Sequence, residues 1–514
     1  MAETNGLLNR RSGINRYRGF ESRPLRANAV RWRRNFGASF FVHPERSRMQ
    51  LEHLRAVVYI LSSVAFIIGL KQLSHPRSAR RGNLVAAAGM LLAIVATMAL
   101  PGSEGRQLGN IGLILAAMAL GTLIGWMSAR RVPMTAMPQM VSLFNGMGGG
   151  CAAAIALLEM VHAAEYLPRL EPAAASMIVA RAIIGSVSLS GSLVAFAKLQ
   201  GILERSLRFR GQNVANSAIA AAALVLGGIV VAQGQANPTL LAGSVALALL
   251  YGIAFVVPIG GADMPVVISF LNSCTGVAAA FGGLYYRNHV MLTGGIVVGA
   301  AGMLLTLLMA RAMNRSVLNV LFSHFGETAT ARGDASHRTM QSITPDDAAV
   351  LLGYARDVVI VPGYGLAVAQ GQHALVKLAS QLEQRGVRVR YAIHPVAGRM
   401  PGHMNVLLAE ANVPYEQLVE MEAINPDMPQ VDVVLVVGAN DVVNPAARTD
   451  PSSPLWGMPI IDADRARNVI VIKRSMNPGY AGVDNALFYL PNTSMLFGDA
   501  KAMLEAVLEK VKSL

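Results

Sequence analysis

The chain changes character near residue 315. Upstream lie long apolar runs with few charges, whereas from Pro345 onward short β-branched segments alternate with charged segments of helical character. The chain is 53% hydrophobic and only 14% charged, and its mean hydropathy is +0.43. These values are too apolar for a soluble protein of this length. The sequence therefore predicts a membrane-embedded part joined to a soluble part.

A helix that crosses a bilayer needs about 20 apolar residues. Nine windows meet this requirement: Ala56–Leu73, Leu84–Leu100, Ile111–Met127, Met137–Met160, Ala174–Ala197, Val214–Val231, Thr239–Val257, Met264–Tyr285 and Val290–Ala310. Lys and Arg concentrate in the loops after spans one, three, five and nine. The positive-inside rule then predicts a multi-pass protein of a cell inner membrane, with a cytoplasmic C-terminal domain.

Residues 1–48 form an extension with eleven arginines and three acids. Two interpretations stay open, a native start at Met49 or an Arg-rich organelle-targeting presequence. We expect a membrane domain at 49–315, a polar linker at 316–342 and a soluble domain at 343–514. No aromatic-interleaved basic surface accompanies the positive charge, so nucleic acid is not an expected partner. The two cysteines lie within apolar runs, and no metal site is expected.

The soluble domain alternates strand and helix patterns. Thr344 and the acids that follow Pro345 predict a capped helix reaching about Tyr354. The expected strands are Asp357–Val361, Val387–Ile393, Val431–Val437 and Asn468–Lys473, and the expected helices include Ala367–Arg385 and Asp499–Val511. Alternating units of this kind predict an α/β, Rossmann-like doubly wound parallel sheet.

A glycine-rich turn follows the first of these strands. Gly363 and Gly365 precede the expected helix, and Val368 stands where the strict dinucleotide fingerprint has Gly or Ala. A turn of this kind predicts that a pyrophosphate lies against the start of the helix. The alternative is an ordinary strand-to-helix turn without a ligand.

The ends of two other strands indicate which dinucleotide binds. The second strand ends at His394, without the acid that would bind a ribose 2′-hydroxyl, whereas Lys473 and Arg474 end a later strand. Two adjacent cations suit a 2′-phosphate. The pattern therefore favours NADP over NAD, with a solvated charge pair as the alternative.

Several longer motifs make the sequence resemble a known family. They are Gly260–Val267, Pro362–Gln370, His394–Asn405, Gly438–Asp441, Asn444–Ala447, Lys473–Asn477, Gly479–Gly482 and Gly498–Lys501. Over roughly Met49 to Leu514 the chain resembles the β subunit of the proton-translocating NAD(P) transhydrogenases. The resemblance implies a helix bundle that conducts protons and a cytosolic domain that binds NADP(H). It also implies an α subunit that binds NAD(H), in an α2β2 assembly, and coupling that favours NADPH formation.

The resemblance also implies the residues of the NADP(H) site. In addition to Gly363 and Gly365 they are Tyr364, Val396, Ala397, Gly398, Arg399, Met400, Pro401, Gly438, Ala439, Asn440, Asp441, Val442, Gly457, Met458, Lys473, Arg474, Ser475, Met476, Asn477, Pro478, Gly479, Tyr480, Asp499 and Ala500. No catalytic side chain is expected, because hydride passes directly between two nicotinamides. In this family the nucleotide lies reversed, which weakens the role inferred above for the glycine turn.

Polar residues within the spans are candidates for the proton path. Asp263 lies at the cytosolic mouth before span eight. Asn145 and Asn272 each lie about 12 Å below the cytosolic edge and are candidates for a shared water-filled path. Hydrogen bonding between helices is the alternative for both. Many relatives place His at the position of Asn145, and an asparagine does not titrate.

Two further charged positions remain to be placed. Asp441 is a second candidate link, since a carboxylate near the cofactor can change protonation as residues 476–482 move; a loop-capping role is the alternative. Arg181 lies within span five, where it either snorkels outward or pairs with Glu159 or Glu171. Two rival functions remain, a membrane transporter with a regulatory NADP-sensing domain and a non-enzymatic membrane anchor.

Overall fold

The computed structural model describes residues 44–73, 76–99, 110–166, 169–203, 211–260, 263–322, 340–400, 402–479 and 481–514. Three sets of sequence-based expectations lie outside these ranges. They are residues 1–43 of the N-terminal extension, residues 323–339 of the linker, and Pro401 and Tyr480 of the expected cofactor site.

Within the described ranges, nine helices are long and apolar enough to cross a membrane. They are α1 (Pro44–Leu73), α2 (Pro76–Ala99), α3 (Ile111–Arg131), α4 (Met137–Tyr166), α5 (Pro172–Leu199), α6 (Gln212–Gln233), α7 (Pro238–Val256), α8 (Met264–Tyr285) and α9 (His289–Ala312). Each contains or overlaps one of the nine windows, so the prediction of nine spans is confirmed. Helix α1 begins at Pro44, inside the segment taken from sequence as an extension.

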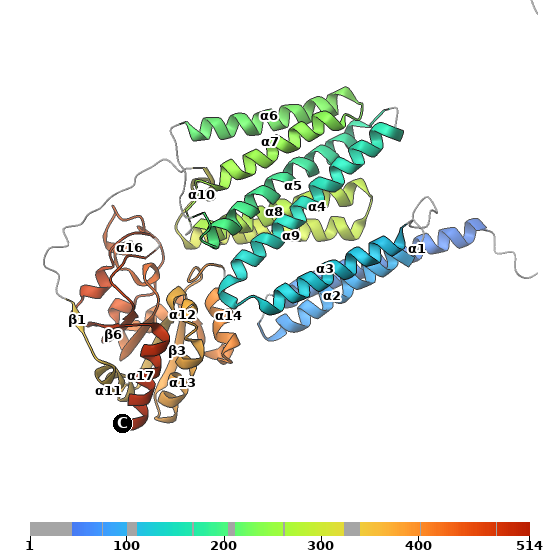
Figure 1. Ribbon diagram of the computed structural model, residues 1–514. Helices are drawn as coiled ribbons and strands as arrows, with labels where there is room; N and C mark the ends of the chain where they lie inside the picture. Colours follow the sequence, from blue (N-terminus) through green and yellow to red (C-terminus); the bar gives the residue numbers. More distant parts are fainter. Residues whose placement is uncertain are drawn as a thin grey trace, which may run out of the picture.

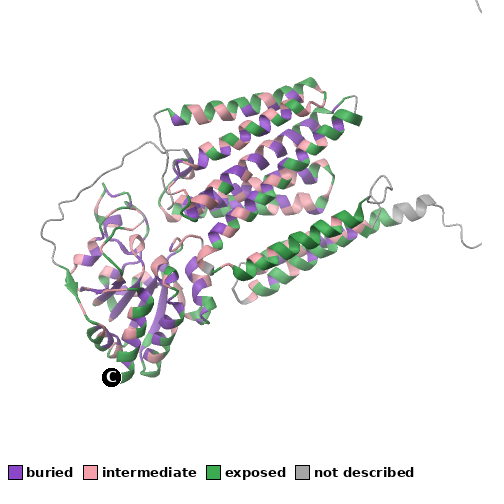
Figure 2. Cartoon of the chain, viewed as in Figure 1, coloured by how far each residue is buried: buried purple, intermediate pink, exposed green. Residues whose placement is uncertain are grey.

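Helix α5 is the centre of the bundle. It packs against α4, α6, α7 and α8, and more than half of its apolar window is buried. Helices α1 and α2 pair with each other beside this bundle and touch it through α9. Helix α3 has no buried residue, and Figure 2 shows it in the colour of exposed residues along most of its length. Apolar side chains on such a surface suit contact with lipid.

Glycines allow the closest helix contacts. A Cβ atom on Gly149 of α4 would lie 2.7 Å from the carbonyl oxygen of Gly185 on α5. One on Gly276 of α8 would lie 2.4 Å from the backbone nitrogen of Gly299 on α9. Small residues at such crossings let the backbones approach, which is how helices gain packing energy in lipid.

In the part of the C-terminal domain that the structure describes, seven parallel strands form one sheet. They are β1 (Gln341–Ser342), β2 (Asp357–Pro362), β3 (Arg388–Ile393), β4 (Leu418–Glu420), β5 (Val433–Val437), β6 (Asn468–Lys473) and β7 (Thr493–Phe497), in the order β1-β7-β6-β5-β2-β3-β4. The described helices of this domain are α11 (Pro345–Gly353), α12 (Tyr364–Val368), α13 (Gln372–Gln384), α14 (His403–Glu410), α15 (Met421–Ile424), α16 (Ala446–Thr449) and α17 (Ala500–Ser513), whereas the short helix α10 (Val317–Phe322) packs against α8 and α9 of the bundle. Apart from edge strand β1, this is the doubly wound order, which confirms the predicted fold.

Local sequence signals explain where several elements begin and end. Helix α11 has the expected cap: Thr344 accepts from the backbone of Asp347, whose carboxylate accepts from the backbone of Thr344. The single helix expected over Ala367–Arg385 is instead two helices, α12 and α13. Gln370 has a φ of +50° and ends the first of them, because a left-handed residue cannot continue a helix. Strands β1, β4 and β7 were not predicted, because they are short or lack a run of β-branched residues.

The soluble domain lies at one end of the helix bundle (Figure 1). Arg399 donates to the carbonyl oxygen of Leu199, the last residue of α5, at 3.2 Å. Asn314, just beyond α9, donates to the carbonyl oxygen of Trp456 at 3.0 Å. These two hydrogen bonds join the loops at the carboxyl ends of the strands to the ends of two membrane helices.

The glycine crossing of α8 and α9 generates a stability prediction. Gly276→Ala places a methyl group against backbone atoms that no rotamer change can move, and overpacking of this kind costs about 1–3 kcal/mol. We expect a lower thermal unfolding midpoint for the detergent-solubilised protein. Gly121→Ala on α3 is the matched control, because its Cβ atom meets nothing within 4 Å and alanine favours a helix. Equal midpoints for the two variants would contradict the packing described.

Candidate functional site

A cavity of about 730 Å³ lies at the carboxyl ends of β2, β5 and β6. Strand order reverses at β2, since β3 lies on one side of it and β5 on the other. Ligands of doubly wound sheets bind outside the carboxyl ends of the strands at such a switch point. The volume is within the range of about 300–1,000 Å³ that is usual for ligand pockets.

Glycines bring the turns after β2 and β5 together at the floor of this cavity. A Cβ atom on Gly363 would lie 2.4 Å from the Cα atom of Ala439, and one on Gly365 would lie 2.7 Å from that of Gly438. Gly438 itself has a φ of +67°, a region that favours glycine. Contact between these two backbone turns therefore requires all three glycines, independently of the ligand.

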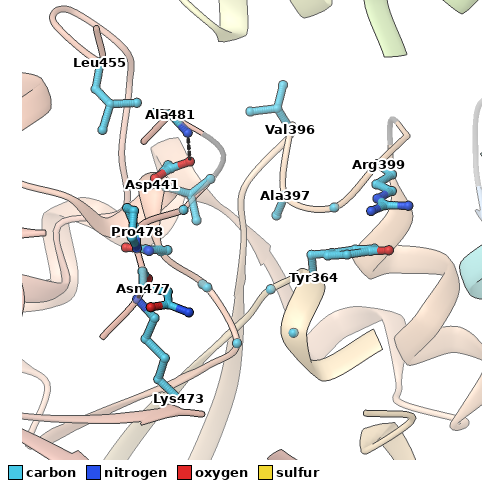
Figure 3. Close-up of a pocket in the computed structure, with 18 of the residues that line it drawn as sticks. Tyr364, Val396, Ala397, Arg399, Asp441, Leu455, Lys473, Asn477, Pro478 and Ala481 are labelled. Carbon is cyan, nitrogen blue, oxygen red and sulfur yellow. Dashed lines mark hydrogen bonds between the residues drawn. The ribbon is translucent and has the colours of Figure 1, made fainter. Parts of the chain in front are cut away.

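Arg399 and Tyr364 form one wall of the cavity. The guanidinium carbon of Arg399 lies 4.4 Å from the centre of the Tyr364 ring, and Figure 3 shows the two side chains stacked. The backbone nitrogen of Arg399 donates to Nδ1 of His403 at 3.0 Å, which fixes the turn. Because Arg399 also contacts the end of α5, one side chain touches both the cavity and the membrane bundle.

Asp441 fixes the opposite wall. Its Oδ2 atom accepts a hydrogen bond from the backbone nitrogen of Ala481 at 3.0 Å (Figure 3). A Cβ atom on Gly479 would lie 2.3 Å from Oδ1, so only glycine leaves room for the carboxylate there. The carboxylate of Asp441 therefore orders part of the segment 476–482, which extends along the cavity.

Positive charge exceeds negative charge around the cavity. Its charged lining consists of four cations and two carboxylates, namely Arg315, Arg399, Lys473, Arg474, Asp441 and Asp499. Lys473 is half-buried and donates to the carbonyl oxygen of Asn477. Burial lowers the pKa of Lys473, whereas Asp441 and Asp484 oppose that shift. Arg474 is exposed. A ligand carrying several negative charges suits this lining.

His394 anchors a further loop of the site. Its Nδ1 atom accepts from the backbone nitrogen of Val396 at 3.2 Å, and its Nε2 atom lies 2.8 Å from the carbonyl oxygen of Pro459. These partners require the neutral tautomer with the proton on Nε2. Burial lowers the pKa of His394 and favours the same neutral form.

Most of the expected cofactor residues lie around this one cavity. Of those that the structure describes, all but Gly457 and Met476 line it. Gly457 lies instead at the contact with the bundle, where a Cβ atom would be 2.2 Å from the amide nitrogen of Asn314. Met476 packs against the core beneath the sheet.

The lining also includes residues that the sequence did not indicate. Pro265 of α8, Met309 of α9, and Met313 and Arg315 just beyond α9 contribute from the membrane bundle. Arg315 forms an ion pair with Asp263 at 3.0 Å, at the start of α8. The expected coupling residue Asp263 therefore contacts a residue of the cavity wall. The sequence indicated only that Asp263 precedes a span, because its partner Arg315 is 52 residues away.

Asn145 belongs to a buried polar cluster deeper in the bundle. Its amide donates to the hydroxyls of Ser188 at 3.2 Å and Ser192 at 2.9 Å, both on α5. The Ser188 hydroxyl in turn contacts the Thr275 hydroxyl of α8 at 2.5 Å. Asn272 is half-buried on α8, and the hydrogen bonds of Asn145 are made to the serines rather than to it. The three hydroxyl groups were not singled out from sequence.

Comparisons with known proteins agree with these features. A family model described as NAD(P) transhydrogenase beta subunit matches residues 55–510. The chain is 44% identical over 464 residues to a protein of Rhodospirillum rubrum named NAD(P) transhydrogenase subunit beta, and the alignment covers 89% of this chain and 98% of that relative. A second relative of the same name, from a designated strain of that species, matches to the same extent. Both similarities span the membrane helices and the soluble domain.

The excess of cations generates a binding prediction. Replacing Lys473 and Arg474 together by alanine should weaken binding of NADP⁺ at least about a hundredfold, because each charge-assisted hydrogen bond contributes roughly 1.5–3 kcal/mol. Isothermal calorimetry on the purified protein measures the change. Lys501→Ala, an exposed cation outside the cavity, is the control. Unchanged affinity in the double variant would refute the assignment of this pair to the 2′-phosphate.

The neutral His394 generates a pH prediction. The unfolded chain binds a proton near the ordinary histidine pKa of 6.5, whereas the buried side chain resists it. Its contribution to stability is therefore present above about pH 6.5 and is lost as the pH falls, by at most about 1.4 kcal/mol per pH unit. His394→Gln, which keeps one acceptor and one donor, should show a smaller fall in unfolding midpoint between pH 7.5 and 5.5. An equal fall in both proteins would contradict this role.

Proposed function

The chain belongs to the family of NAD(P) transhydrogenase β subunits, and from this premise we propose that it is half of a proton pump. Hydride transfer between NAD(H) and NADP(H) is coupled in this proposal to proton movement through the bundle, in the direction that favours NADPH. NADP(H) occupies the cavity at the carboxyl ends of β2, β5 and β6. The observation that carries the proposal is that the ends of α8 and α9 form part of the wall of that cavity.

The residues present fit NADP(H). Lys473 and Arg474 at the end of β6 suit the 2′-phosphate, and Arg399 suits a second phosphate group. The nicotinamide would supply the hydride chemistry. The chain itself positions the ligand and excludes water, which is what direct transfer requires. Asp441 orders Ala481 and so contributes to a closed wall on one side of the site.

The proposed coupling passes through Asp263 and Arg315. Protonation of Asp263 would remove the charge that Arg315 faces, and Arg315 lines the cavity. The two protonation states then favour different arrangements of the cavity wall, which is the requirement for linkage between two sites. A proton crossing 100 mV supplies roughly 2.3 kcal/mol, or about a forty-fold change in an equilibrium constant.

The remaining parts of the proposal concern partners and location. The described residues form one nucleotide-type fold, and we propose that an α subunit supplies the NAD(H) site in an α2β2 assembly. Activity requires that partner. The distribution of Lys and Arg supports an inner-membrane protein with the soluble domain in the cytoplasm.

Inverted membrane vesicles that contain both subunits test this function. Reduction of an NAD⁺ analogue by NADPH runs opposite to the direction that favours NADPH, so it should move protons into the interior of inverted vesicles, and a pH-sensitive dye reports that acidification. An uncoupler should abolish the dye signal and leave hydride transfer intact. Hydride transfer without a dye signal would refute the pump, and absence of both would refute transhydrogenase activity.

The ion pair gives a further prediction. Asp263→Asn removes the charge opposite Arg315 and should slow coupled turnover and proton movement at least about tenfold, the effect of roughly 1.4 kcal/mol. Calorimetric affinity for NADP⁺ should change much less, which shows that the variant is folded. Asp346→Asn, an exposed acid on α11, serves as the control. Proton movement at the wild-type rate in Asp263→Asn would eliminate Asp263 from the coupling.

A further inference from the structure

A buried ion pair lies in the half of the bundle that the mechanism above does not use. Arg181 of α5 is only 1% exposed and pairs with Glu159 of α4, whose side chain is 11% exposed. The sequence left Glu159 and Glu171 as possible partners of Arg181, and in the structure the partner is Glu159. Placing two charges among apolar helices is costly, and ionisable residues inside a membrane usually mark the path of an ion or proton.

The pair leaves polar atoms without partners. Nε and Nη1 of Arg181 and Oε1 of Glu159 are buried and have no hydrogen bond within normal geometry. The guanidinium carbon of Arg181 lies 5.9 and 5.6 Å from the ring centres of Tyr285 and Tyr286, and the Tyr286 hydroxyl faces the carboxylate. Buried donors and acceptors favour polar partners, and the Tyr286 hydroxyl is the polar group that faces the pair.

The pair lies toward the end of the bundle that is away from the nucleotide cavity. Glu159 lies seven residues before the end of α4, and Tyr285 and Tyr286 close the same end of α8. We call this end, which is remote from the soluble domain, the distal end (Figure 1). Fourteen residues along α4 separate Glu159 from Asn145, or roughly 21 Å of helix. The pair is therefore close to the water beyond the distal end and remote from the nucleotide cavity.

A tightly packed segment separates the pair from the Asn145 cluster. Between them, the backbones of α4 and α5 meet at Gly149 and Gly185, and Ala156 and Ala182 are fully buried. The buried polar side chain of Ser186 also lies in this segment, where its hydroxyl donates to the carbonyl oxygen of Ala182 within α5. A proton from the distal side would meet this close helix contact before it reaches the Asn145 cluster.

We propose that Glu159 is the site at which protons bind and leave at the distal end of the bundle, an inference that rests on the proposed proton pump. A proton from water adds to Oε1 and converts the carboxylate to a neutral acid, while Arg181 keeps its charge on Oε2. Loss of that proton, outward or inward, restores the ion pair. The other titratable groups near the carboxylate are Tyr285, Tyr286 and His162, one turn along α4.

Two substitutions distinguish proton binding from a structural role. Glu159→Gln keeps the length and an acceptor for Arg181 but cannot titrate, whereas Glu159→Asp titrates but is shorter. Proton binding predicts that Asp retains part of the proton movement while Gln loses at least about 90% of it, a tenfold loss or more. A structural role predicts the reverse order, because Gln fits the space better. The order Gln above Asp, or wild-type proton movement in Gln, would overturn the proposal.

The measurement uses the complex of both subunits in proteoliposomes, with dye quenching for protons and absorbance for hydride transfer. NADP⁺ affinity should stay within about twofold of wild type in both variants, because the cavity is remote and a twofold change is only about 0.4 kcal/mol. Glu165→Gln, an exposed acid on the same helix, should leave proton movement unchanged. The double variant Glu159→Gln with Arg181→Gln removes both charges. Its failure to move protons supports the proposal, and its recovery of proton movement overturns it.

The outcome for the wild-type protein keeps the two proposals separate. If the wild-type complex transfers hydride without moving protons, the proposed function fails, whatever the variants do. If the wild-type complex moves protons and Glu159→Gln moves them equally well, only the assignment of Glu159 fails.

Discussion

The ion pair between Asp263 and Arg315 is the contact that relates the helix bundle to the cavity of the sheet domain. It joins the residue before α8 to a residue just beyond α9, so it closes the end of the bundle that faces the sheet. Arg315 at the same time lines the cavity at the carboxyl ends of the strands. A charge that belongs to the bundle is therefore also part of the electrostatic environment of the ligand. Neither the bundle nor the sheet alone defines this site.

The sequence predicted the kinds of element well and the contacts between them poorly. The nine spans and the β-branched strands could be predicted because each depends on local composition. Contact with lipid and burial in a sheet both require a local run of apolar residues. The break at Gln370 and the short strands β1, β4 and β7 depend on tertiary contacts that carry no such local signal. Ion pairs are harder still to predict from sequence, because the partner of Asp263 is far along the chain.

The candidate site shows the same division. Sequence motifs predicted the cavity residues in the loops after the strands, because residues that contact a ligand there are contiguous in the sequence. The wall contributed by Pro265, Met309 and Met313 was missed, because apolar residues at a span boundary look the same whether they meet lipid, water or a ligand. Ser188, Ser192 and Thr275 were missed for a related reason. Small hydroxyl residues are common in packed membrane helices, and only their convergence on Asn145 distinguishes them.

Helix α5 connects the three regions of the molecule. Arg181 lies on its distal half, Ser188 and Ser192 in its middle, and the carbonyl oxygen of Leu199 accepts from Arg399 at its end. An α-helix is stiff along its axis, so a displacement of α5 changes all three contacts together. Because close-packed interfaces shift between discrete arrangements rather than deform continuously, such a displacement is suited to exposing the polar groups to one end at a time. The glycine contact between α4 and α5, where Gly149 and Gly185 bring the two backbones together, lies between the Arg181 pair and the Asn145 cluster, so a displacement of α5 must also change this contact.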